Sequence, residues 1–301
     1  MKQPLFSILI ANYNNGRYLQ EAIDSVLAQT YTNWEVILVD DKSTDKSFEI
    51  YEKYKDDPRF HIYYNEVNKG CGYTKRRCAQ LANGELCGFL DPDDKLVTKA
   101  LSVMVGAHDS HPECSLIYST LYLWDDIKDT KTILDAVGPM AEGEDFLVST
   151  QKIVSHFAVF KRSYYEKTEG IDKTLQSAVD FDLYVKLEEV GVLLFVDEPL
   201  YCYRQNNPSS ISIGNEKNKN SAFRNKNRAS LEAFCRRIKG RMPLYYKKKD
   251  LYLATMRWNL SYFHQQPGKE SRAWLKYCCC YLWANHFSVS AVNHIRKIIV
   301  K

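Results

Sequence analysis

Short uninterrupted runs of apolar residues alternate with amphipathic segments along the first part of the chain. Residues 5–11 are nearly all apolar, as in a strand that is buried on both faces of a parallel sheet. Apolar positions between 17 and 29 fall on one stripe, which predicts a helix. Further strands are expected at 34–39, 60–64 and 86–90, with a helix in each interval. This order predicts an α/β fold with a doubly wound, Rossmann-like and mostly parallel sheet that has helices on both faces.

The pattern changes in the second half of the chain. Residues 206–227 are rich in Asn, Ser and Lys, which predicts a flexible linker or lid over 215–228. Helical patterns follow it, so we expect a helical C-terminal extension over 229–301 after a main domain over 1–214. The elements expected before the linker are strands at 116–124, 153–160 and 193–196 and a helix at 180–190.

Charge is distributed unevenly between these parts. Residues 1–214 carry a net charge of −11, whereas residues 215–301 carry +15. A basic extension on an acidic body indicates an anionic partner, which is a membrane surface, a phosphorylated acceptor or the acidic body itself. The aromatic and basic residues of 229–301 are typical of peripheral membrane contact, and equally of helices packed on the body. No nucleic-acid partner is expected, because the chain contains no binding motif for one.

Three features favour a cytoplasmic location. The chain contains no run of eighteen apolar residues, so no transmembrane helix is expected. Its first residues lack the apolar region of a signal peptide. Its nine cysteines form no CxxC pair, and we expect them to be reduced thiols.

Acidic residues follow two of the expected strands. Asp91, Asp93 and Asp94 come directly after the strand at 86–90, and Asp41 follows the strand at 34–39. Burying several carboxylates without a partner is costly, whereas Mn²⁺ or Mg²⁺ prefers oxygen ligands of this kind. A solvated acidic turn is the alternative. Ligands of doubly wound sheets bind beyond the carboxyl ends of the strands, which favours a site here.

A series of motifs in order resembles a family 2 glycosyltransferase with a GT-A fold, over about residues 4–214. The positions that carry the resemblance are 10–14 (IANYN), 25–31 (SVLAQTY), 39–45 (VDDKSTD), 68–70 (NKG), 82–85 (ANGE), 90–94 (LDPDD), 178–183 (AVDFDL) and 203–204 (YR).

The resemblance implies inverting, metal-dependent transfer of a sugar from a nucleotide-diphospho sugar to a glycan or a lipid-linked glycan. It implies that Asp180 is the catalytic base and that Asp93, with Asp91, holds Mn²⁺ or Mg²⁺. Asp94 is the third candidate ligand, with a contact to sugar hydroxyls or a helix cap as its alternatives. Asp182, two residues after the base, is expected to point elsewhere on the helix.

The resemblance also implies a nucleotide site. Asp41 corresponds to a residue that accepts a hydrogen bond from the base, and its carboxylate fits the imide of uracil, so a UDP-sugar donor is expected. Tyr13 flanks the base or is a core tyrosine, and the backbone of Ala11 touches the nucleotide.

Basic groups are expected on the diphosphate. Lys75 stands where the family has an arginine, and Arg76 or Arg77 takes the role after a one-residue shift of register. Arg204 is a candidate clamp on the diphosphate. His156 lines the acceptor or phosphate side, or is a structural histidine. Two other functions remain open: a nucleotidyltransferase of similar fold, and a non-catalytic glycan- or partner-binding protein.

Overall fold

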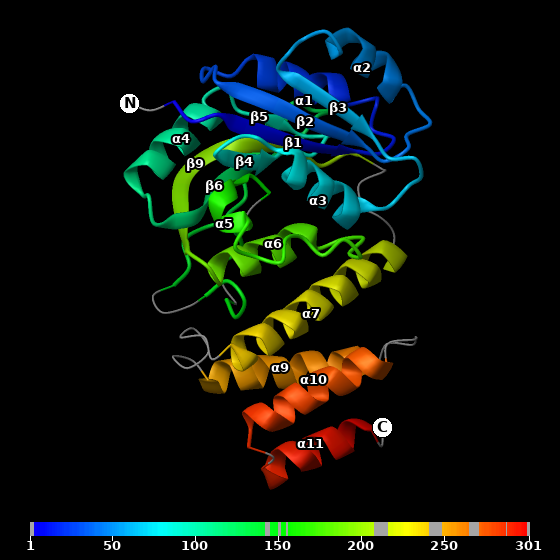
Figure 1. Cartoon of the computed structure of the whole chain (residues 1–301), viewed down its shortest axis with the longest axis vertical. Coiled ribbons are helices and arrows are strands. Elements are labelled where there is room, and N and C mark those ends of the chain that lie inside the picture. The colour runs from blue at the N-terminus through cyan, green and yellow to red at the C-terminus, as the bar shows by residue number, and fades with distance from the viewer. Residues whose placement is uncertain are drawn as a thin grey trace.

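The computed structural model describes residues 3–141, 145–149, 152–154, 156–207, 216–240, 249–264, 271–286 and 288–299. A body built on one sheet lies at one end of the molecule, and a stack of helices lies at the other (Figure 1). Helix α6 lies between them, on the side of the sheet that faces the stack.

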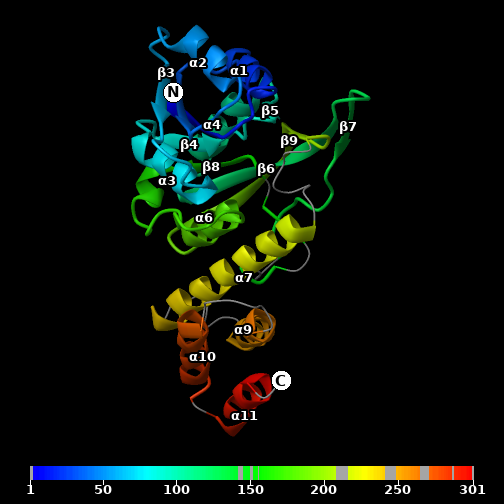
Figure 2. The same ribbon diagram turned by 90° about the vertical axis from the view of Figure 1, so that its right-hand side faces the viewer.

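The sheet has the strand order β3-β2-β1-β4-β8-β6-β9-β5, with β7 paired to β6. The strands are β1 Phe6–Asn12, β2 Trp34–Asp40, β3 Phe60–Tyr64, β4 Leu86–Phe89, β5 Lys95–Leu96, β6 Cys114–Asp125, β7 Thr130–Ile133, β8 Ala158–Lys161 and β9 Val192–Arg204. The first four pair in parallel, as the alternation predicts. β8 then joins β4 and β6 in antiparallel, while β6 and β9 are parallel. The paired ends of β6 and β7 project from the body as a hairpin (Figure 2).

The first four predicted strands are confirmed, and two later ones differ in length. The strand predicted at 153–160 is confined to β8, while Ile153 makes only an isolated bridge to Val137 and residue 155 lies outside the described residues. The strand predicted at 193–196 continues to Arg204, because β9 follows β6 over most of its length.

Helices cover both faces of the sheet. Alternate side chains of β1 point to opposite faces, so Ile8 packs with α1 and α2 while Leu9 packs with α3 and α6. The helices of the body are α1 Leu19–Leu27, α2 Ser47–Tyr54, α3 Cys71–Leu81, α4 Ala100–Ser110, α5 Arg162–Tyr165 and α6 Val179–Glu188. The doubly wound arrangement expected from the sequence is therefore present.

The flexible linker predicted over 215–228 is corrected from residue 216 onward, since helix α7 spans Glu216–Lys239. Residue 215 lies outside the described residues. Two polar residues of the predicted linker, Asn225 and Arg228, donate hydrogen bonds to the body from this helix.

The rest of the extension is helical, as predicted, with α9 at Lys249–His264, α10 at Ser271–Ala284 and α11 at Val289–Ile299. Helices α9 and α10 pack on α7, and α11 packs on α9 and α10 (Figure 2). In the sequence, the apolar positions 251, 254, 258 and 262 fall on one stripe, which predicts the buried side of α9. The observed core is offset from it, because Ala254 is exposed while Tyr252 and Met256 are buried. The side chains of the other stripe positions, 251, 258 and 262, lie outside the described residues.

Part of the basic charge of the extension meets the acidic body. Arg237 of α7 is fully buried, with its guanidinium 2.7 Å from Glu188 and 3.2 Å from Glu189. Arg236 makes a second ion pair with Glu189 at 2.9 Å. One of the three anionic partners that the sequence suggests is thus the body itself. Within the described part of the chain, every helix is too short or too polar to be a bilayer-spanning segment.

Candidate active site

One cavity of about 430 Å³ opens beyond the carboxyl ends of β1, β2 and β4. Parallel strands bring their carboxyl ends to the same edge, so residues far apart in the sequence meet there. The predicted site residues that line this cavity are Ala11, Tyr13, Asp41, Lys75, Asp91, Asp93, Asp94, His156 and Asp180. The predicted convergence of the strand-end aspartates with Asp180 is therefore observed.

Lys75 joins two of these carboxylates. Its Nζ lies 3.0 Å from Oδ1 of Asp91 and 3.0 Å from Oδ1 of Asp180. Burial alone would lower the pKa of Lys75, but the charges of Asp180 and Asp91 hold it well above its usual value. Burial likewise opposes ionisation of Asp91, but Lys75 and then His156 lower its pKa. Lys75 is therefore a charged link between the turn after β4 and the first turn of α6.

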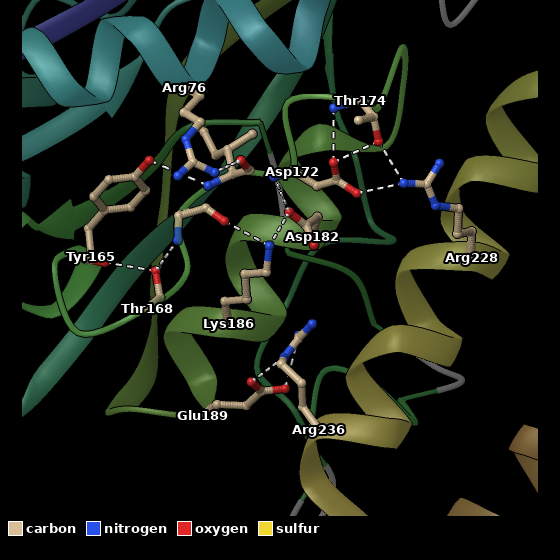
Figure 3. Close-up of polar contacts among 12 residues, drawn as sticks. Arg76, Tyr165, Thr168, Asp172, Thr174, Asp182, Lys186, Glu189, Arg228 and Arg236 are labelled. Atoms are coloured by element: carbon tan, nitrogen blue, oxygen red, sulfur yellow. Dashed lines mark hydrogen bonds and ion pairs between the residues drawn. The ribbon is translucent and has the colours of Figure 1, made fainter. Parts of the chain in front are cut away.

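The start of α6 places Asp180 in the cavity and turns Asp182 away from it. Ala178, just before the helix, has a φ of 57°, a left-handed conformation that is unusual for a residue with a side chain. Asp182 is buried on the other side, where Oδ2 accepts hydrogen bonds from Nζ of Lys186 at 2.7 Å and from the amide of Asp172 at 2.9 Å (Figure 3). The separation expected for two aspartates in one helical turn is thus observed.

The three carboxylates after β4 that are predicted to hold a metal have different surroundings. Asp94 is 1% exposed, and its oxygens accept hydrogen bonds from the Tyr201 hydroxyl and the Arg204 amide, both at 2.8 Å. It therefore holds the turn in place. Asp94 also lines the cavity, so its role as a third metal ligand stays a prediction.

Asp91 and Asp93 keep carboxylates on the cavity wall. Burial and the charge of Asp91 raise the pKa of Asp93, and a divalent cation between them would relieve both effects. No group of three His, Cys, Asp or Glu side chains suited to a metal occurs within the residues that the structure describes. A pair of carboxylates still fits Mn²⁺ or Mg²⁺, which take their other ligands from phosphate and water.

Arg204 does not reach the cavity, and its predicted role as a diphosphate clamp is wrong for this structure. Its side chain is 2% exposed and lies against the rings of Tyr18 and Trp124, with its Nε donating to the Asp93 carbonyl at 2.8 Å. The reason is the pleat of β9, because neighbouring residues of a strand point to opposite faces. Tyr203 lines the cavity, and Arg204 therefore faces away.

Arg76 is also turned away. Its Nη1 donates to the carbonyl of Ile171 at 2.8 Å (Figure 3), and Arg76 is not among the residues that line the cavity. Arg77 instead donates to Tyr64 and Asn65 on the body surface. Among the described residues that line the cavity, Lys75 is the one lysine or arginine, so the shifted register considered for Arg76 and Arg77 is not adopted.

The nucleotide-side candidates have mixed environments. Tyr13 is 47% exposed at the cavity, which excludes the alternative of a core tyrosine. Asp41 is buried and holds the loop before α3: its Oδ1 accepts from Asn65 and from the amide of Lys69, and its Oδ2 accepts from the amide of Gly70. A carboxylate offers about four acceptor positions, so one further hydrogen bond can be accepted from the cavity side.

Several cavity residues were not singled out from the sequence. One of them is Tyr203, whose ring lies 4.7 Å from that of the predicted residue His156. Another is Asn207, which donates to Oδ2 of Asp93 at 2.7 Å. Gln176 and Ser177 form the wall before α6. Because neighbouring residues of β9 face opposite sides, Tyr203 would be expected at the cavity if Arg204 were known to face the interior of the body. Gln176, Ser177 and Asn207 lie in loops, where no period marks the lining side.

The fold and the place of this cavity, at the carboxyl ends of parallel strands, define a doubly wound α/β protein, and comparison with known proteins identifies the family. The family model for glycosyl transferase family 2 matches residues 7–168, more than half of the chain. The chain therefore belongs to glycosyl transferase family 2, as its motifs predict. Chondroitin synthase of Escherichia coli is 31% identical over 199 residues, which cover 66% of this chain and 28% of that protein. The chain thus spans little more than a quarter of that relative.

Solved structures share the fold at low sequence identity. S. aureus TarS 1-349 in complex with UDP has a TM-score of 0.67 and 18% identity, over 93% of this chain and 80% of that chain. The mannosyltransferase PcManGT from Pyrobaculum calidifontis, in complex with GDP-Man and Mn²⁺, has a TM-score of 0.58 and 15% identity, over 98% and 86% of the two chains. The predicted GT-A fold with a helical C-terminal region is confirmed by these likenesses.

Proposed function

We propose that this chain is an inverting, metal-dependent glycosyltransferase. It moves a sugar from a nucleotide-diphospho sugar, with a UDP-sugar as the expected donor, to a hydroxyl of a glycan or a lipid-linked glycan. One observation carries the proposal: Asp91 and Asp180 line one cavity, and Nζ of Lys75 lies 3.0 Å from a carboxylate oxygen of each. Family membership supports this activity over that of a nucleotidyltransferase. The intact set of carboxylates favours a catalytic protein over one that only binds.

Asp180 is the proposed base. In an inverting displacement the acceptor hydroxyl attacks the anomeric carbon opposite the leaving diphosphate, so one carboxylate is enough to take its proton. Lys75 donates to Oδ1 of Asp180 and fixes the orientation of the carboxylate. No hydrogen bond from the described residues reaches Oδ2, so this oxygen is the one proposed to accept the proton.

Ala11, Tyr13 and Asp41 form the proposed nucleotide side. The exposed ring of Tyr13 offers a face for stacking on a base. The remaining acceptor position of Asp41 fits the imide N–H of uracil, which is why a UDP-sugar is preferred. Neighbouring structures with bound UDP and with bound GDP-Man support a nucleotide-sugar donor in this fold.

Asp91 and Asp93 are the residues proposed to hold Mn²⁺ or Mg²⁺. When bound, the ion would supply Lewis-acid stabilisation of the charge that develops on the diphosphate. Lys75 adds a fixed positive charge beside Asp91, and His156 is assigned to the phosphate or acceptor side. The Mn²⁺ in the mannosyltransferase complex supports this assignment by analogy of fold.

The extension is proposed to contact an anionic membrane where a lipid-linked acceptor would lie. Residues 241–301 carry eleven Lys and Arg but only two Asp and Glu. Leu275, Trp283 and Val289 expose 56%, 46% and 77% of their surface on α10 and α11. Aromatic and aliphatic side chains beside basic ones suit the interface of such a membrane.

A panel of nucleotide sugars tests the proposal. Each donor is incubated with the chain in Mn²⁺ or in chelator, with and without glycan acceptors, and nucleotide release is measured. We expect one UDP-sugar to be turned over in Mn²⁺ and not in chelator, and UDP to bind more tightly with Mn²⁺. In the same series, sedimentation with vesicles that contain anionic lipid reports membrane contact.

Two results would contradict the proposal. Equal UDP affinity in Mn²⁺ and in chelator would remove the metal assignment. Release of nucleotide from no donor, by a chain that is folded and binds no UDP, would remove the glycosyltransferase itself.

A further inference from the structure

The wall of the cavity that carries Asp180 is held from outside by the C-terminal extension. Residues 172–178 form a loop that leads into α6, and its last residues line the cavity together with Asp180. On its inner side, the carbonyl of Leu175 accepts a hydrogen bond from the amide of Gly72 at the start of α3. Its outer side faces α7.

Two side chains of α7 bind this loop. The guanidinium of Arg228 donates to Oδ2 of Asp172 at 2.8 Å and to Oγ1 of Thr174 at 2.6 Å (Figure 3). Nδ2 of Asn225 donates to the hydroxyl of Ser177 at 2.8 Å, and Ser177 itself lines the cavity. The middle of α7 therefore binds the same loop at both ends.

The second half of α7 binds the other end of α6. Arg236 pairs with Glu189 just after the helix (Figure 3), and the buried Arg237 pairs with Glu188. The contact points on α7, Asn225 to Arg236, are eleven residues or about 16 Å apart along a helix. Helix α7 therefore runs along α6 and fixes both its entry and its exit.

We propose that α7 positions the catalytic wall of the active site, and that Arg228 and Asn225 are positioning residues for the transfer reaction. This inference rests on the proposed function, because it takes Asp180 as the base. Neither residue is among those that line the cavity, so both act through Asp172, Thr174 and Ser177. The extension is then a working part of the active site as well as a basic appendage.

Electrostatics supports the geometry. Burial alone would raise the pKa of Asp172, but hydrogen bonds from the amide and hydroxyl of Thr174, together with the charges of Arg228 and Lys186, lower it. Asp172 is thus an ionised centre that joins α7 to the loop, while its own amide donates to Asp182 inside α6.

The chain offers a matched control. Arg228 and Arg236 lie on the same helix, are 28% and 21% exposed, and each pairs with one carboxylate at 2.8 and 2.9 Å. Arg228 binds the loop at the cavity, whereas Arg236 binds the exit of α6. Replacing either by alanine removes a comparable ion pair, and we expect only the replacement of Arg228 to loosen the cavity wall.

The experiment compares Arg228→Ala, Arg228→Lys and Arg236→Ala in the full chain, by hydrogen exchange and by transfer kinetics with the donor found active. For Arg228→Ala we expect faster amide exchange over 172–178, a fall in kcat of about tenfold, and a UDP affinity within twofold of the unaltered chain, because misplacement of a reacting group acts on the chemical step. Arg228→Lys should recover part of kcat, since lysine keeps the charge and loses the fork. For Arg236→Ala we expect faster exchange near 186–190 and a kcat within twofold.

The inference is overturned if Arg228→Ala leaves exchange over 172–178 unchanged, or if the loop loosens while kcat does not fall below that of Arg236→Ala. The proposed function fails separately, when the unaltered chain turns over no nucleotide sugar. In that case exchange over 172–178 alone decides whether α7 holds the wall.

Discussion

Helix α6 carries two aspartates, two residues apart, that have opposite environments. Asp180 faces the cavity, is 30% exposed and shares Lys75 with Asp91. Asp182 is 4% exposed and pairs with Lys186, which is itself 5% exposed. Each is a carboxylate within 3.0 Å of a lysine, so the pair alone does not distinguish a functional group from a structural one.

The difference lies in what else each pair touches. Lys186 donates to the carbonyl of Gly170, and Asp182 accepts from the amide of Asp172. The pair of Asp182 and Lys186 therefore joins one loop to α6. The pair of Asp180 and Lys75 instead links α6 to α3 and, through Asp91, to the turn after β4 at the cavity. Position at a cavity between separate elements, rather than the ion pair, therefore marks the candidate for chemistry.

The largest difference between Asp180 and Asp182 is expected in catalysis. Asp180→Asn removes the proposed base and should lower kcat by about 10²- to 10⁴-fold, the usual contribution of a general base, with UDP binding retained. Asp182→Asn, measured where circular dichroism shows that it is folded, should keep kcat within about tenfold. Steady-state transfer and UDP titration measure both. Retained transfer by Asp180→Asn would assign the base elsewhere.

The next largest difference is expected in stability, where the replacement of Asp182 should cost more than that of Asp180. Asp182→Asn leaves the buried Lys186 without its counter-ion and should lower the free energy of unfolding by about 3 kcal/mol. Asp180→Asn should cost about 1 kcal/mol or less, because Lys75 keeps Asp91 as a partner. Urea denaturation measures both.

The double variant Asp182→Asn with Lys186→Met provides the control for this stability difference. It removes the unpaired charge and keeps an acceptor for the amide of Asp172, so most of the lost stability should return. If the double variant is no more stable than Asp182→Asn, the ion pair is not the cause of the loss.

The periodic parts of the chain were predictable, and so was the cavity edge. Buried runs such as β1 and β2 have the continuous apolar pattern of a parallel sheet, and the ends of parallel strands must share an edge. Asp41 and Asp91 were therefore placed correctly at the cavity. The resemblance, rather than any pattern, placed Asp180 and Lys75 there.

Side-chain direction in loops and at strand ends was not predictable. Arg204 is one residue from Tyr203, and only the pairing of β9 with β6 and β5 decides which of the two faces the cavity. Asp94 is one residue from Asp93, and its role follows from Tyr201, more than a hundred residues later. The prediction of a linker at 215–228 was wrong for another reason. Asn225 and Arg228 bind the body, and local composition does not show such contacts.

The smallest effect is expected on the stability in acid, and it concerns Asp172, which donates its amide to Asp182 but does not line the cavity. The folded pKa of Asp172 is below its ordinary value of 3.8, since its hydrogen bonds and the neighbouring cations outweigh burial. A carboxylate of this kind stabilises the fold above pH 3.8, and its contribution is lost as the pH falls through the folded pKa. Asp172→Asn should therefore lose less stability than the unaltered chain between pH 4 and pH 3, by under about 1 kcal/mol because the pair is partly exposed. Urea denaturation at several pH values measures the difference. Parallel curves for the two proteins would mean that Asp172 is not the ionised centre that joins α7 to the cavity wall. The link between α7 and the loop over 172–178 would then rest on the hydrogen bonds from Arg228 to Thr174 and from Asn225 to Ser177.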